Sequence, residues 1–111
     1  GLNVWSNVHL DDVVSLYLLA LKSAPAGAFY FAESGEASFA AIGAALATRL
    51  GLGAVESLPA ELAAQRWGEA RAYYSLGSNS RVRAVRARRE LGWRPTHNSV
   101  IDWILNEMPV A

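Results

Sequence analysis

The sequence contains no cysteine, which excludes disulfide bonds, thiolate zinc sites and thiol nucleophiles and fits a reducing compartment. It also lacks an apolar run of the roughly 18 residues that a membrane span needs, and no charged segment with a cleavage site opens it. Ten basic residues balance ten acidic ones, so no overall field directs the chain to nucleic acid or anionic lipid. We therefore expect a cytoplasmic protein whose partners include no nucleic acid and no membrane.

Several catalytic motifs are also missing. Lys22 is the only lysine and is preceded four positions earlier by Leu18, so the chain has no Tyr-x-x-x-Lys pair for proton transfer. Two histidines are too few for a metal site without carboxylate help. The segment Gly51-Leu52-Gly53 begins like a dinucleotide fingerprint, but it ends a predicted helix and lacks the third glycine. We assign no catalytic, cofactor or metal residue to this chain.

What remains is a short, apolar sequence. A chain of 111 residues that is 52% hydrophobic predicts a single globular unit over residues 1–111. Gly1 opens it in the middle of a strand-like pattern, and its only methionine is Met108. These two features suggest a fragment of a longer protein.

The stretch from Val8 to Leu21 is the one around which we expect the chain to be organised. Val4 to Leu10 alternates as in a short strand, and Asp11 or Asp12 is predicted to cap a helix that ends near Lys22 or Ser23. This interpretation makes the Asp pair a cap and not a catalytic dyad. Apolar side chains point in nearly every direction from this helix, so we expect it to be buried on several sides.

The next segments predict a βαβ unit. Ala28–Ala32 is a continuous apolar run typical of a strand covered on both faces in a parallel sheet. The crossover through the first helix would then be right-handed. Glu33–Ala37 is predicted to be a loop, and Ser38 to cap a second helix that Gly51 ends.

The second half of the chain predicts mainly helices. The expected elements are a brief strand over Ala54–Leu58, a third helix from Pro59 to about Arg66, a fourth that begins within Ser78–Ser80 and ends at Leu91, and a fifth capped by Asn98 or Ser99. The fold class is therefore α/β, with about five helices and two or three short strands.

Arginines cluster between Arg81 and Arg89, where five occur within nine positions. On a helix these side chains spread around the surface, whereas Ala84, Ala87 and Leu91 form a narrow buried stripe. A solvated helix is therefore favoured over one that binds nucleic acid.

A second group combines arginine with aromatic residues. Arg66 to Arg71 is followed by Tyr73 and Tyr74, and guanidinium groups beside aromatic rings can bind a phosphate or carboxylate and stack a ring. An exposed surface that binds no ligand is an equally favoured interpretation of these residues. His9, at the end of the first predicted strand, either contacts a ligand or bonds the backbone, and the backbone role is favoured.

Five segments together resemble the C-terminal part of a known family. They are V-H-L-D-D-V from Val8, A-G-A-F-Y-F-A-E-S-G-E from Ala26, Ser38-Phe39, Arg66-Trp67-Gly68-Glu69, and S-N-S-R-V from Ser78 with R-R-E-L-G-W-R-P from Arg88. In this order and spacing they resemble extended or atypical short-chain dehydrogenase/reductases of the NAD-dependent epimerase/dehydratase family. The resemblance covers nearly all of the chain.

The resemblance implies a partial lobe of a Rossmann-type enzyme. Family members bind NAD or NADP through a Gly-rich loop on an N-terminal Rossmann domain and react through Ser/Thr and Tyr-x-x-x-Lys residues, all absent here. This chain would be the substrate-side lobe, inactive alone, in which Arg66 contacts a nucleotide-sugar diphosphate. Tyr73, Tyr74 and His9 are the other candidate substrate-binding residues.

Two alternatives stay open. Glu69, Ser78 and Arg81 depart from the family pattern, which leaves a small carbonyl compound as an alternative substrate. A stand-alone module for protein interaction or small-ligand binding is the alternative function. In either case, exposed apolar surface would favour a homo-oligomer.

Overall fold

The structure, a computed structural model, describes residues 1–111 and contains six helices and a two-stranded antiparallel sheet. Strand β1 (Val4–Asn7) pairs with β2 (Gly35–Ser38) in the register Val4 to Ser38 and Asn7 to Gly35. The backbone of Ser80 bonds the other edge of β1, through Ser6 N–H to Ser80 O (2.8 Å) and Ser80 N–H to Val4 O (3.0 Å). The predicted combination of helices and short strands is thus confirmed.

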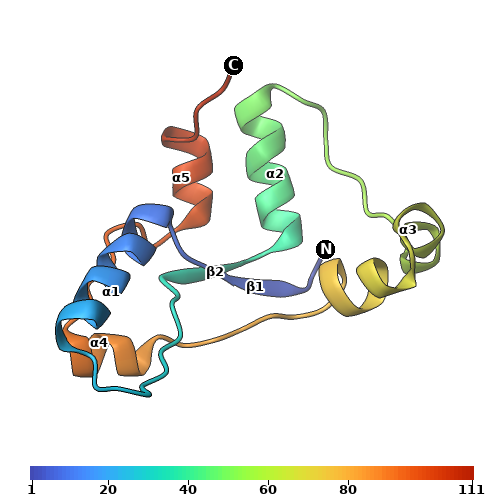
Figure 1. Cartoon of the computed structure of the whole chain (residues 1–111). Coiled ribbons are helices and arrows are strands. Elements are labelled where there is room, and N and C mark those ends of the chain that lie inside the picture. Colours follow the sequence, from blue (N-terminus) through green and yellow to red (C-terminus); the bar gives the residue numbers. More distant parts are fainter.

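The helices surround this small sheet unevenly. They are α1 (Leu10–Ser23), α2 (Phe39–Leu50), α3 (Ala60–Trp67), the π-helix η1 (Ala70–Leu76), α4 (Val85–Leu91) and α5 (Val100–Asn106). Figure 1 shows α2 beside α5, α1 near α4, and α3 on the opposite side of the molecule from α1. No helix is both long enough and apolar enough to cross a membrane.

Several predicted boundaries are confirmed. The Ser38 side chain caps α2 by accepting from the Ala41 N–H (3.2 Å), and Gly51 ends that helix in the left-handed conformation (φ 65°). Helix α3 begins directly after Pro59. The Ser99 side chain caps α5. These boundaries are set by local chemistry, which the sequence displays directly.

The predicted βαβ unit is wrong. Ala28–Ala32 is not a strand, and β2, which overlaps the segment predicted to be a loop, runs antiparallel to β1. The apolar run does not pair with β1, because one edge of β1 bonds β2 and the other bonds the backbone of Ser80. The segment predicted as a strand over Ala54–Leu58 also has no regular structure.

Two predicted helix starts are also wrong. The N-cap of α1 is His9 and neither aspartate. Helix α4 begins at Val85 because the Ser78–Ser80 segment bonds β1: the Asn79 side-chain oxygen accepts from the Val4 N–H (2.7 Å). Asn and Ser side chains can bond either the edge of a sheet or the start of a helix, so the composition of Ser78–Ser80 does not distinguish the two uses.

The main core lies between α1 and α4. Leu16, Ala84, Ala87 and Trp93 form it, and the Trp93 indole N–H donates to Asp12 O (2.9 Å) and Ser15 Oγ (3.0 Å). Within α1 only Asp12 and Leu16 are buried. The chain itself thus covers only one face of α1, and burial of its other sides, expected from the sequence, would need a partner outside this chain.

Candidate functional site

His9 lies at the junction of β1 and α1. Its Nδ1 accepts a hydrogen bond from the Asp11 N–H (3.2 Å), which satisfies one of the free donors at the start of the helix. The backbone role favoured from the sequence is confirmed. In the neutral ring this bond assigns the proton to Nε2, which makes no hydrogen bond within the chain.

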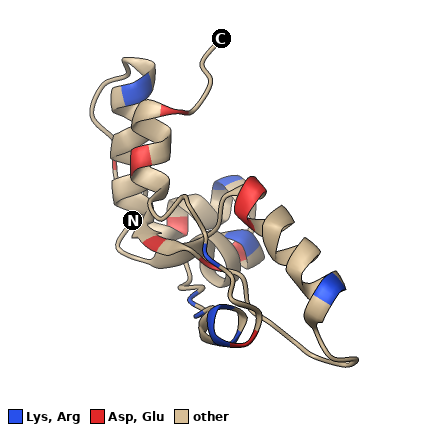
Figure 2. Cartoon of the chain, turned by 90° about the vertical axis from the view of Figure 1, so that its left-hand side faces the viewer, with Lys and Arg blue, Asp and Glu red and all other residues tan.

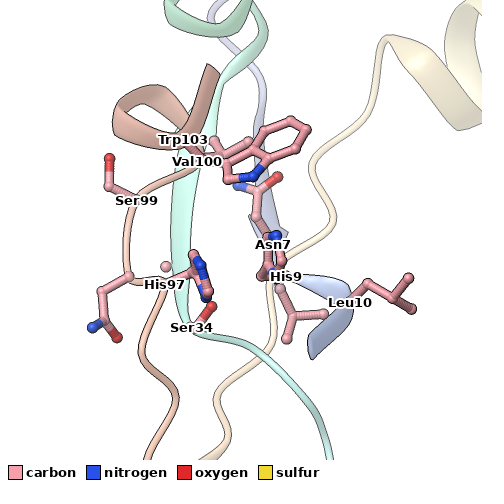
Figure 3. A pocket seen from close by; sticks show the side chains of 11 residues that line it. Asn7, His9, Leu10, Ser34, His97, Ser99, Val100 and Trp103 are labelled. Atoms are coloured by element: carbon pink, nitrogen blue, oxygen red, sulfur yellow. The ribbon is translucent and has the colours of Figure 1, made fainter. Parts of the chain in front are cut away.

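His9 also lines a cavity of about 270 Å³, here called the histidine pocket. Its polar and aromatic lining residues are Asn7, His9, Ser34, His97, Asn98, Ser99 and Trp103. They come from the end of β1, the N-cap of α1, the residue before β2, the loop before α5 and α5 itself. Figure 3 shows these side chains around the cavity.

Two imidazole rings form one wall of the pocket. The rings of His9 and His97 stack with centroids 3.8 Å apart and an interplanar angle of 15°. The Trp103 ring meets His9 at 63°, with centroids 5.8 Å apart. Such a wall matches a flat ligand better than a branched aliphatic one.

Asp12 holds this arrangement in place. Its Oδ1 accepts from the Thr96 N–H (2.8 Å) and its Oδ2 from the His97 N–H (2.9 Å), so one buried carboxylate fixes the loop before α5. Burial alone would raise the pKa of Asp12, but the hydrogen bonds from Thr96 and His97 outweigh it and lower that pKa. Asp12 is therefore ionised at neutral pH and acts as a tertiary anchor.

Both nitrogens of His97 face carboxylates. Nδ1 lies 3.3 Å from Asp12 Oδ2, and Nε2 lies 3.4 Å from Glu107 Oε2. A serine nucleophile such as Ser34 would need an unprotonated, free ring nitrogen on its base, but both nitrogens of His97 are engaged and the free Nε2 of His9 carries the proton in the assigned tautomer. The chain contains no group of three or more His, Asp or Glu side chains arranged to hold a metal ion. The arrangement suits binding better than acyl transfer.

The other three predicted substrate contacts lie elsewhere. Arg66 is exposed near the end of α3, and Tyr73 (41% exposed) and Tyr74 (81% exposed) are on η1. None of them lines the histidine pocket, and α3 lies across the molecule from α1 in Figure 1. The structure therefore separates His9 from these three residues. Arg66 forms no salt bridge within the chain, so its guanidinium is free to meet an anion.

The arginine cluster has a structural role. Glu36 pairs with Arg81 (2.7 Å) and Arg83 (2.9 Å), and Arg86 pairs with Glu90 (2.9 Å). Figure 2 shows basic and acidic segments interspersed along the ribbon. The predicted stripe is largely confirmed, since Ala84 and Ala87 are buried. The arginines therefore tie α4 and the preceding segment to neighbouring parts of the chain.

Sequence reasoning missed most of the histidine pocket. Ser34 and Trp103 were not singled out, Asp12 was interpreted only as a cap, and His97 is far from His9 in the chain. One signal was available: only one residue caps a helix, so a pair of aspartates leaves one free for another role. Nothing in the sequence indicates that this role involves Thr96 and His97.

No family model matches the chain, but a known protein is similar to it in sequence. An uncharacterized protein of the fission yeast Schizosaccharomyces pombe is 28% identical to it over 102 residues. The match covers 91% of this chain and 34% of that protein, so the chain spans about a third of the length of the relative it matches. No solved structure matches.

Proposed function

We propose that this chain is the substrate-side lobe of a longer NAD- or NADP-dependent epimerase, dehydratase or reductase. The observation that carries the proposal is the amount of apolar surface that the chain leaves uncovered. In the proposed protein a Rossmann domain covers this surface and supplies the cofactor and the catalytic residues. The proposal places the protein in the cytoplasm and makes this lobe inactive alone.

The molecule is more open than a self-contained domain of its size. Its accessible surface is 7730 Å², whereas a compact monomer of 12.0 kDa exposes about 6,000 Å². The radius of gyration is 16.6 Å, against about 13 Å for a compact chain of 111 residues. The excess surface is about 1,700 Å², roughly twice what one partner buries in a standard interface.

Helix α1 contributes an apolar stripe to this surface. Its members are Leu10, Val14, Tyr17, Leu18 and Leu21, all exposed. At about 100° per residue these five positions span roughly 100° of the helix, which is the width of a face that packs on a core. The opposite face carries the buried residues Asp12 and Leu16. The α1 stripe thus has the form of a buried helix face without its partner.

The extended segment Ala28–Ala32 adds a second uncovered surface. Phe29 is 65% exposed and Phe31 48% exposed, and their rings form an edge-to-face pair with centroids 5.0 Å apart. The N–H groups of residues 29–32 make no hydrogen bond to the backbone of this chain. Free backbone donors in an apolar, aromatic segment suit addition to the edge of a sheet. This supports the proposed contact with a Rossmann sheet.

Substrate contacts within this proposal remain Arg66, Tyr73, Tyr74 and His9. The exposed Arg66 on α3 would meet an anionic group, and the two tyrosines would flank the bound molecule. His9 belongs to a different region, where it lines the histidine pocket. The proposed substrate of the first region is a nucleotide sugar or a small carbonyl compound, and NAD or NADP would bind outside this chain.

Two measurements test the proposal. Isothermal titration calorimetry of the 111-residue chain with NADH is expected to show no binding, because the chain lacks the Gly-rich loop. The reading frame that precedes Gly1 is expected to encode G-x-x-G-x-x-G and Y-x-x-x-K. Tight NADH binding to the chain alone, or a frame without these motifs, would reject the proposal.

A second function, a self-associating interaction module, is favoured by the α1 stripe itself. A two-fold axis would bring the same apolar face of two copies together and remove it from water. Sedimentation velocity at several concentrations measures this directly. A single, monomeric sedimentation coefficient at every concentration would reject self-association.

A further inference from the structure

The histidine pocket is built completely by this chain. Its walls come from Asn7–Leu10, Ser34–Gly35, His97–Val100 and Trp103. All the residues named for this site thus belong to the chain itself, and none of them is a residue of the absent Rossmann domain. A cavity of about 150 Å³ is enough for benzene, so the 270 Å³ here hold one ring with a small substituent.

The pocket contains a hydroxyl group without a partner. Ser34 is 6% exposed and lines the cavity, and its side chain makes no hydrogen bond within the chain. The His9 Nε2 is likewise free, as its Nδ1 is used by the Asp11 N–H. Both groups are therefore available to a ligand that carries a matching donor or acceptor.

The charges around the pocket disfavour an anion. No arginine or lysine lines the cavity. The only group there that can become cationic besides His9 is His97, and Asp12 and Glu107 already face both of its nitrogens, at 3.3 and 3.4 Å. A phosphate or carboxylate in the cavity would therefore find no arginine or lysine to compensate its charge, and the histidine that could do so besides His9 already faces two carboxylates.

From these observations we propose that the histidine pocket binds a small, neutral, planar ring that carries a hydrogen-bonding substituent of amide type. The ring lies against the imidazole and indole surfaces, and the substituent meets Ser34 Oγ and the His9 Nε2–H. This ligand class differs from the anionic group expected at Arg66. The chain thus carries two separate sites of different charge preference.

Three probes of nearly equal shape test the charge preference: benzamide, benzoate and the benzamidinium cation. Each is titrated into the ¹⁵N-labelled chain at pH 7.5 and followed by the backbone amide resonances. Benzamide is expected to shift Ser34, Gly35, His97 and Asn98 saturably, with benzoate at least about tenfold weaker. The proposal is overturned if benzoate or benzamidinium binds as tightly as benzamide, or if benzamide shifts none of these resonances.

Ser34→Ala tests the polar contact. Removing a hydroxyl that bonds no other group of the chain should leave the fold intact, because no hydrogen bond within the chain is lost. The benzamide affinity is expected to fall about three- to tenfold, the equivalent of one hydrogen bond. Ser23→Ala, at the exposed end of α1, is the matched control and should bind as the parent chain does. Equal affinities for the two variants would refute the assigned contact.

Discussion

At the residue scale, Asp12 connects the start of α1 to the loop before α5. Its carboxylate accepts from two backbone N–H groups, and its own backbone oxygen accepts from the Trp93 indole. Asp12 therefore contacts the core through its backbone and the loop that lines the histidine pocket through its side chain. Asp11, its neighbour, is exposed and makes no comparable contact.

Asp12→Asn is expected to destabilise the chain by about 2 kcal/mol, since the new amide group must face one of the two backbone donors. Chemical denaturation monitored by circular dichroism measures the free energy of unfolding. Asp11→Asn is the control and should change it by less than about 0.5 kcal/mol. Equal effects of the two substitutions would contradict the anchoring role.

Glu36 is expected to titrate far below an ordinary glutamate. Hydrogen bonds from Arg83 and then Arg81 lower its pKa from 4.5 to about 2. Because the folded pKa is depressed, the stabilisation from this carboxylate is complete above pH 4.5 and is lost as the pH falls toward 2. A ¹³C NMR titration of the side-chain carboxyl should give a midpoint near 2.

Arg83→Gln should raise that midpoint, because it removes the largest contribution to the shift. The exposed Arg94, which forms no ion pair, provides the control, and Arg94→Gln should leave the midpoint of Glu36 unchanged. A midpoint close to 4.5 in the parent chain would show that these ion pairs do not persist in solution.

At the element scale, β2 and the loop before α5 approach closely at Gly35. A Cβ atom at this position would lie 2.5 Å from the backbone oxygen of Asn98. Only a residue without a side chain permits this approach, which also forms one wall of the histidine pocket. The requirement comes from spatial proximity and not from a special backbone angle.

Gly35→Ala is accordingly expected to lower the free energy of unfolding by about 1–3 kcal/mol, because backbone must move to accommodate the methyl group. The thermal midpoint measured by calorimetry should fall. Gly53→Ala is the matched control, since a Cβ there meets nothing within 4 Å. If Gly35→Ala and Gly53→Ala have the same thermal midpoint, the close contact at Asn98 is absent in solution.

At the scale of the whole molecule, the uncovered α1 stripe should determine how the isolated chain behaves. Leu18→Glu places a charge in the centre of the stripe and is expected to abolish concentration-dependent association, because a charge is costly to bury. Analytical ultracentrifugation measures the loss. Leu52→Glu is the control: Leu52 is 65% exposed and Leu18 63%, but Leu52 lies outside α1. If the Leu18→Glu variant still associates, the contact between copies of the chain lies on a surface other than the α1 stripe.

Elements with local signals were predictable from the sequence. Ser38 and Gly51 bound α2 because a side-chain cap and a left-handed glycine act within a few residues of chain. The same locality explains Ser99 at the start of α5. His9 was placed correctly in its backbone role, which also involves only neighbouring residues.

Local sequence signals were therefore enough to predict the starts of α2, α3 and α5 and the buried face of the α4 segment. The strand pairing, the role of Asp12 and the stack of His9 on His97 could not be predicted in this way, because they depend on contacts between residues distant in the chain. Ala28–Ala32 shows the difference most clearly: its composition predicts a strand, but a strand also requires a neighbour.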